Sequence, residues 1–139
     1  MGVAIPARTT RCWQRCCMRS QVELRLPPEP IAPTLARAAV AAVGLPEAVA
    51  SDIELLATEI VSNAVRHANL DPSDEIILRI VADGYVRVEV TDLGPPFEPK
   101  LRRLEPGPSG WGLFLVDTLS TSWGVEAEGI GKKVWFELA

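Results

Sequence analysis

The chain has 139 residues, 47% of them hydrophobic, which is enough for one hydrophobic core and too short for a second domain. No stretch approaches the roughly 20 uninterrupted apolar residues of a membrane-spanning helix, and no charged-then-apolar leader opens the sequence. We therefore expect a cytoplasmic protein with no membrane partner.

The first 20 residues hold four arginines and no acidic residue, which leaves 10 basic against 18 acidic residues in the rest of the chain. Because an acidic surface repels nucleic-acid phosphates, we expect no direct binding to DNA or RNA.

Residues 1–20 form an arginine-rich and cysteine-rich segment without apolar periodicity, which predicts a disordered tail. Cys12, Cys16 and Cys17 lie close together in this tail, but no second cysteine pair follows to complete four zinc ligands. The cluster is therefore weak as a metal site. We place the folded domain at residues 21–139.

The first half of this domain predicts one strand and two helices. Residues 22–26 predict a short strand that ends at a proline pair, and residues 34–43 predict a helix that ends at Gly44. Pro46 opens the strongest predicted helix, which runs to about residue 68. Its buried face is predicted from apolar residues spaced three and four apart: Ile53, Leu56, Ala57, Ile60, Val61, Ala64, Val65 and Ala68.

The second half predicts four strands and one helix. Residues 75–82 and 85–91 predict an antiparallel pair joined by an Asp-Gly turn. Residues 95–109 contain five prolines and three bases and lack periodicity, which predicts a long loop that acts as a lid.

The chain then continues as a helix from about residue 110 to 119, followed by strands at residues 122–127 and 132–138. Hairpins with helices between them predict an α+β fold, a two-layer sandwich in which helices cover one face of a mixed, mostly antiparallel sheet.

A polar row lies along the long predicted helix, because Glu59, Asn63 and His67 are spaced four apart at the shoulder of the apolar stripe. The amide oxygen of Asn63 can ligate Mg²⁺, which prefers hard oxygen donors. The carboxylate of Glu59 can orient or deprotonate an attacking hydroxyl or water. The alternative is a row of polar side chains that only contact solvent or neighbouring groups.

An acidic side chain continues the inward face of residues 85–91. The alternation of that strand predicts that Asp92 points inward, where an ionised carboxylate needs a partner. The exocyclic amine of adenine is a suitable donor, and Gly94 lets the backbone approach a flat ring. The alternative is an aspartate that only forms a turn.

A Gly-Trp-Gly-Leu run at residues 110–113 begins the third predicted helix. Glycines there leave the first-turn amides accessible, and these amides and the helix dipole favour phosphate oxygens. The run follows three bases of the predicted lid, namely Lys100, Arg102 and Arg103. A plain helix start and a solvated charge run are the alternatives.

Together and in this order, the three motifs resemble the N, G1 and G2 boxes of the histidine-kinase-like (GHKL) ATPase superfamily, which includes type II topoisomerases, histidine kinases and heat-shock chaperones. The resemblance covers about residues 22–138. Within the superfamily, the short chain is most similar to anti-sigma-factor serine-protein kinases and their bacterial regulatory relatives. The fold that this resemblance implies is the Bergerat-type ATP-binding fold.

The resemblance also implies roles for single residues. Asn63 is implied to bind Mg²⁺, Glu59 to be the catalytic carboxylate, and Asp92 with Gly94 to hold the adenine of ATP. The residues implied to face the phosphates are Arg102, Arg103, Gly110, Gly112 and Leu113. Two positions depart from the family pattern: Pro96 replaces a frequent second glycine, and Lys133 stands near where a Thr or Ser commonly supports the adenine carboxylate.

The function implied is that of an ATP-dependent serine/threonine kinase that phosphorylates an anti-anti-sigma protein of the STAS type, with a sigma factor as a second partner. The sequence leaves open whether the chain forms a homodimer. The alternatives are a nucleotide-dependent binding module without phosphotransfer and an interaction domain without nucleotide. His67 is the only histidine, so no phosphoacceptor helix of a histidine kinase is present, and no Walker-type phosphate loop occurs. Topoisomerase and chaperone functions need further domains.

Overall fold

The computed structural model describes residues 20–67, 70–94 and 111–139, with the backbone alone at 67 and 111–113. These ranges contain all of the predicted strands and helices, whose ends lie within two residues of the predicted ones. In chain order they are β1 (Ser20–Leu26), α2 (Ala32–Val43), α3 (Glu47–His67), β2 (Ile76–Ala82), β3 (Val86–Asp92), α4 (Trp111–Leu119), β4 (Ser122–Glu128) and β5 (Gly131–Leu138). The predicted lid and the cysteine cluster lie outside the described residues.

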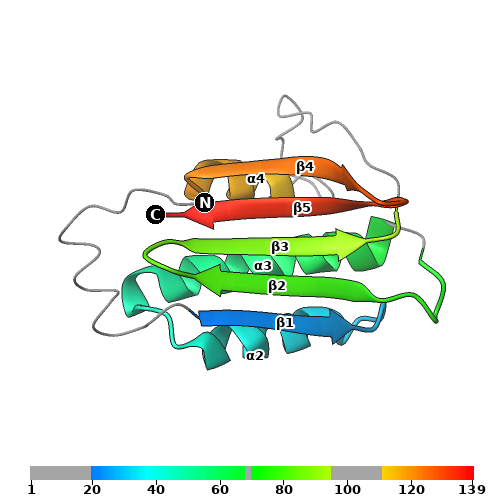
Figure 1. Ribbon diagram of the computed structural model, residues 1–139, viewed down its shortest axis with the longest axis horizontal. Coiled ribbons are helices and arrows are strands. Elements are labelled where there is room, and N and C mark those ends of the chain that lie inside the picture. Colours follow the sequence, from blue (N-terminus) through cyan, green and yellow to red (C-terminus); the bar gives the residue numbers. More distant parts are fainter. Residues whose placement is uncertain (1–19, 68–69, 95–110) are drawn as a thin grey trace.

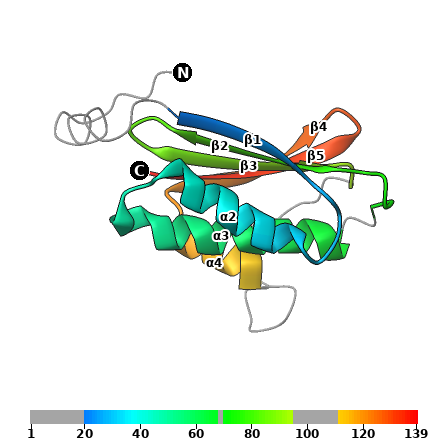
Figure 2. The ribbon, with the colours of Figure 1, turned by 90° about the horizontal axis from the view of Figure 1, so that it is seen from below.

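The strands form one sheet in the order β1-β2-β3-β5-β4 (Figure 1). Each of the four described pairings is antiparallel, so the described part of the sheet has none of the parallel pairing that a mixed sheet would contain. The three helices of the described residues lie on the same face of the sheet, as Figure 2 shows. The predicted two-layer α+β sandwich is confirmed. None of the described helices is long and apolar enough to cross a membrane.

The core fills the space between the helices and the inner face of the sheet. On α3 the predicted buried stripe is confirmed by six fully or almost fully buried residues: Ile53, Leu56, Ala57, Ile60, Val61 and Ala64. Val65 is partly buried against this core, and Ala68 lies outside the described residues. The helix α2 ends as predicted, because Gly44 takes the left-handed conformation (φ 76°) that terminates a helix.

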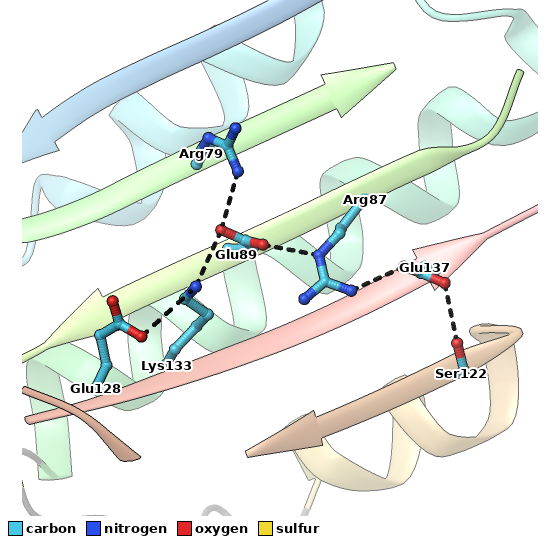
Figure 3. A network of polar contacts seen from close by, with 7 residues as sticks. All are labelled: Arg79, Arg87, Glu89, Ser122, Glu128, Lys133 and Glu137. Atoms are coloured by element: carbon cyan, nitrogen blue, oxygen red, sulfur yellow. Dashed lines mark hydrogen bonds and ion pairs between the residues drawn. The ribbon is translucent and has the colours of Figure 1, made fainter. Parts of the chain in front are cut away.

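The outer face of the sheet carries a network of charged side chains (Figure 3). At its centre, Glu89 is only 7% exposed and accepts a 2.7 Å hydrogen bond from Nε of Arg87. Arg79 and Lys133 lie within ion-pair distance of the same carboxylate, at 3.4 and 3.6 Å. Burial by itself raises the pKa of Glu89, but the hydrogen bond from Arg87 and the nearby positive charges outweigh it and hold the pKa below its ordinary value.

Candidate functional site

The polar row of α3 lies at the edge of the buried stripe, as its spacing predicted. Glu59 and Asn63 are both partly buried, between the apolar face and solvent. His67 is the last residue of α3, and only its backbone is described. The C-terminal end of α3 lies at the same end of the molecule as the C-terminal end of β3, at the right of Figure 1. The row is therefore near the end of the sheet where Asp92 lies.

The amide oxygen of Asn63 accepts one hydrogen bond, from the side chain of Arg66. Nη2 of Arg66 donates a 3.0 Å hydrogen bond to Oδ1 of Asn63, and Nη1 of Arg66 donates a 2.7 Å bond to the hydroxyl of Ser62. A carbonyl oxygen has two lone pairs, so Oδ1 can accept a second hydrogen bond or coordinate a cation. An amide oxygen is a hard donor of the type that Mg²⁺ accepts. One turn away on the same helix, Glu59 offers a carboxylate.

Asp92 is the last residue of β3 and is 3% exposed, in agreement with the inward direction that strand alternation predicted. Its carboxylate already has partners within the chain. Nζ of Lys132 donates to Oδ1 at 2.7 Å and to Oδ2 at 2.9 Å. The backbone N–H of Gly94 donates to Oδ1 at 2.6 Å, so the aspartate also forms the turn that was the alternative interpretation.

A close approach of two strand ends positions this carboxylate. Asp92 of β3 and Lys132 of β5 are directly opposite in the antiparallel register. A Cβ atom at the neighbouring Gly131 would overlap the carbonyl oxygen of Asp92 and lie 2.8 Å from Cα of Leu93. Only glycine therefore fits at position 131 while the Asp92 turn stays in place.

Lys132 is the site residue that sequence reasoning missed. Its signal was available, because Lys132 shares the parity of Val134, Phe136 and Leu138, which are all buried on the inner face. The family pattern points to Lys133 instead. Lys133 faces the other side of the sheet, where its Nζ lies 3.6 Å from Glu89, and so it does not support Asp92.

The phosphate-facing candidates are only partly within the described residues. Arg102, Arg103 and Gly110 lie outside them, as does Lys100. Gly112 and Leu113 lie in the first turn of α4, where the backbone alone is described. The structure thus brings Glu59 and Asn63 together on α3, and Asp92 and Gly94 together at the end of β3. These two elements pack against each other, and α4 packs against α3.

Comparison with proteins of known structure shows the same fold. The structure of the RsbU and RsbW domains of Rv1364c from Mycobacterium tuberculosis superposes with a TM-score of 0.65, at 20% identity over 86% of this chain and 32% of that one. A blue-light activated histidine kinase from Erythrobacter litoralis superposes with a TM-score of 0.54, at 23% identity over 76% of this chain and 39% of that one. The chain thus spans only 32% and 39% of the lengths of these two structures.

Comparison of sequences identifies the family. An uncharacterized protein of Streptomyces coelicolor is 34% identical over 88 residues, which cover 59% of this chain and 80% of the relative. The family model described as histidine kinase-like ATPase domain matches residues 26–138, a span that includes all three motifs. The chain therefore belongs to the histidine kinase-like ATPase domain family, a kinase-type ATPase family whose membership implies ATP binding.

Proposed function

We propose that this chain is an anti-sigma-type serine-protein kinase that binds ATP with Mg²⁺ and phosphorylates an anti-anti-sigma protein of the STAS type, with a sigma factor as its second partner. The proposal rests above all on the match to a histidine kinase-like ATPase domain over residues 26–138. The anti-sigma role and the partners come from the resemblance of the motifs to those of the anti-sigma-factor kinases.

At the base end of the site, Asp92 and Gly94 hold the adenine. The carboxylate of Asp92 is buried and accepts the exocyclic amine, so a base without an amino group there leaves an acceptor unpaired. Gly94 is also buried and has no side chain, which allows the backbone to approach a flat ring closely.

At the phosphate end, Asn63 offers its amide oxygen to Mg²⁺. The phosphates are contacted by the basic side chains of Arg102 and Arg103 and by the backbone at Gly110, Gly112 and Leu113. When bound, Mg²⁺ supplies positive charge that stabilises the transferring phosphoryl group. Glu59 orients the hydroxyl of the partner's serine and accepts its proton while the serine oxygen bonds to phosphorus and ADP leaves.

Substitution of Glu59 tests this proposal. The purified full chain is titrated with Mg-ATP by calorimetry and then incubated with labelled ATP and a purified STAS-type protein. We expect Glu59→Gln to reduce phosphotransfer by at least about 100-fold, because the proton acceptor is lost, while ATP binding stays within about threefold of wild type. Glu54→Gln makes the same change on α3 outside the polar row and should retain both activities.

Three results would each contradict a different part of this proposal. An unchanged transfer rate in Glu59→Gln removes Glu59 from the mechanism. ATP binding without transfer to any STAS-type protein favours a nucleotide-dependent binding module that holds its partner without phosphorylating it. Absence of any heat with Mg-ATP contradicts the nucleotide site itself.

A further inference from the structure

Asp92 and Lys132 form an ion pair inside the molecule, with side chains that are 1% and 8% exposed. Buried ion pairs contribute little net stability, because removing two charges from water costs about as much as their attraction returns. Replacement of a buried ion pair by apolar residues of similar volume is often neutral or stabilising. The pair therefore calls for an explanation other than stability.

The hydrogen bonds of Asp92 leave one acceptor position open. An ionised carboxylate offers about four lone-pair positions, two on each oxygen. Oδ1 accepts from Nζ of Lys132 and from the N–H of Gly94, so both of its positions are used. Among the described residues Oδ2 accepts from Lys132 alone, so one of its two lone-pair positions has no donor there.

The three hydrogen bonds also hold the carboxylate plane in one orientation. Lys132 contacts both oxygens from the opposite strand, and Gly94 contacts Oδ1 from the turn two residues further on. A carboxylate held at one oxygen can rotate about its Cβ–Cγ bond, but a carboxylate contacted at both oxygens from two directions cannot. The free lone pair of Oδ2 consequently has a fixed direction.

We infer that Lys132 is a positioning residue for base recognition, which holds Asp92 so that Oδ2 presents a single acceptor to the 6-amino group of a purine nucleotide. This inference rests on the proposed nucleotide site at Asp92 and extends it to a residue that does not itself contact the base. Without Lys132 the buried carboxylate is free to turn, and selection for the amino group is then lost.

The test compares two nucleotides that differ only in the 6-amino group, Mg-ATP and the Mg complex of purine riboside triphosphate, by calorimetry on the full chain. Wild type should bind ATP about tenfold more tightly, because the analogue leaves the Oδ2 acceptor unpaired. In Lys132→Met this preference should fall to within about twofold, since the phosphates still bind but the carboxylate is no longer oriented. A purely structural role of Lys132 would weaken both nucleotides equally and leave the preference unchanged.

Two further variants complete the experiment. Lys133→Met removes the same charge one residue away on the opposite face of β5 and should keep the full preference for ATP. Lys132→Gln keeps one neutral donor near the carboxylate, so it can fold if Lys132→Met does not, and its preference should lie between those of wild type and Lys132→Met. Thermal melting of each variant shows which of them are folded.

Each outcome tests either the positioning role of Lys132 or the proposed nucleotide site. A folded Lys132 variant that keeps the wild-type preference overturns the inference and leaves ATP binding intact. Equal binding of both nucleotides by wild type also overturns it. Failure of wild type to bind Mg-ATP contradicts the proposed function itself.

Discussion

At the scale of single residues, the end of β3 shows how one aspartate serves two purposes. Oδ1 of Asp92 accepts the N–H of Gly94 and closes a turn, while the same carboxylate compensates the buried charge of Lys132. The contact with Lys132 depends on the close approach of β5, which Gly131 allows. The geometry of the site therefore depends on a residue that has no side chain.

Replacement of Gly131 tests this dependence. Because an added Cβ overlaps the carbonyl oxygen of Asp92, we expect Gly131→Ala to lower the free energy of unfolding by at least about 2 kcal/mol and to weaken ATP binding. Urea unfolding and calorimetry measure the two effects. Gly129→Asn is the matched control in the same hairpin, since Gly129 has φ 59°, which asparagine tolerates, and open space around it. A Gly131→Ala protein with wild-type stability would show that the strand ends can move apart.

At the scale of elements, α3 carries the core on one face and the polar row at its edge. Leu56 is fully buried, whereas its neighbour Leu55 is 40% exposed. The two leucines differ in direction by about 100°, the rotation per residue of an α-helix, and this rotation alone decides which one contacts the sheet. The same rotation places Glu59 and Asn63 at the border of the core.

The two leucines provide a matched pair for mutation. Leu56→Ala should lower the free energy of unfolding by about 2–5 kcal/mol, because it leaves a cavity between α3 and the sheet. Leu55→Ala removes the same atoms from a largely hydrated position and should cost less than about 1 kcal/mol. Urea unfolding of both variants measures the difference. Equal losses would mean that α3 is rotated relative to the structure described above.

At the scale of the whole molecule, the sheet has an apolar inner face under the helices and a charged outer face. Glu89 is buried within the outer network, and the positive charges around it keep its pKa below the ordinary value of 4.5. A depressed pKa means that the folded state binds the proton less tightly than the unfolded state. The ion pairs of Glu89 therefore add stability above pH 4.5, and this contribution is lost as the pH falls through the depressed pKa.

Acid unfolding of Glu89→Gln tests this coupling. At neutral pH the variant should be less stable than wild type, because Arg87 loses a charged partner, and the difference should shrink as the pH falls below 4.5. Urea unfolding across this range measures the difference. Glu23→Gln removes one exposed carboxylate from the same face of the sheet, opposite Arg79 in the register, and should show a much smaller pH dependence. A difference that stays constant with pH would show that Glu89 acts through packing instead of charge.

Much of the fold could be predicted from local patterns. Periodicity together with proline, glycine and turn signals located each described helix and strand, because the rotation of a helix and the alternation of a strand sort apolar residues onto one face. Alternation also predicted that Asp92 points inward. The spacing of Glu59 and Asn63 placed both at the shoulder of the buried stripe. Each of these predictions depends only on residues close together in the chain.

The sequence by itself thus determined the elements, the buried faces and the motifs that identify the family. Only the tertiary structure decided that Asp92 meets Lys132, a residue 40 positions away. The physical reason is strand register: alternation places Lys132 on the inner face of the sheet, but only the pairing of β3 with β5 sets it directly opposite Asp92. Local periodicity contains no information on that register.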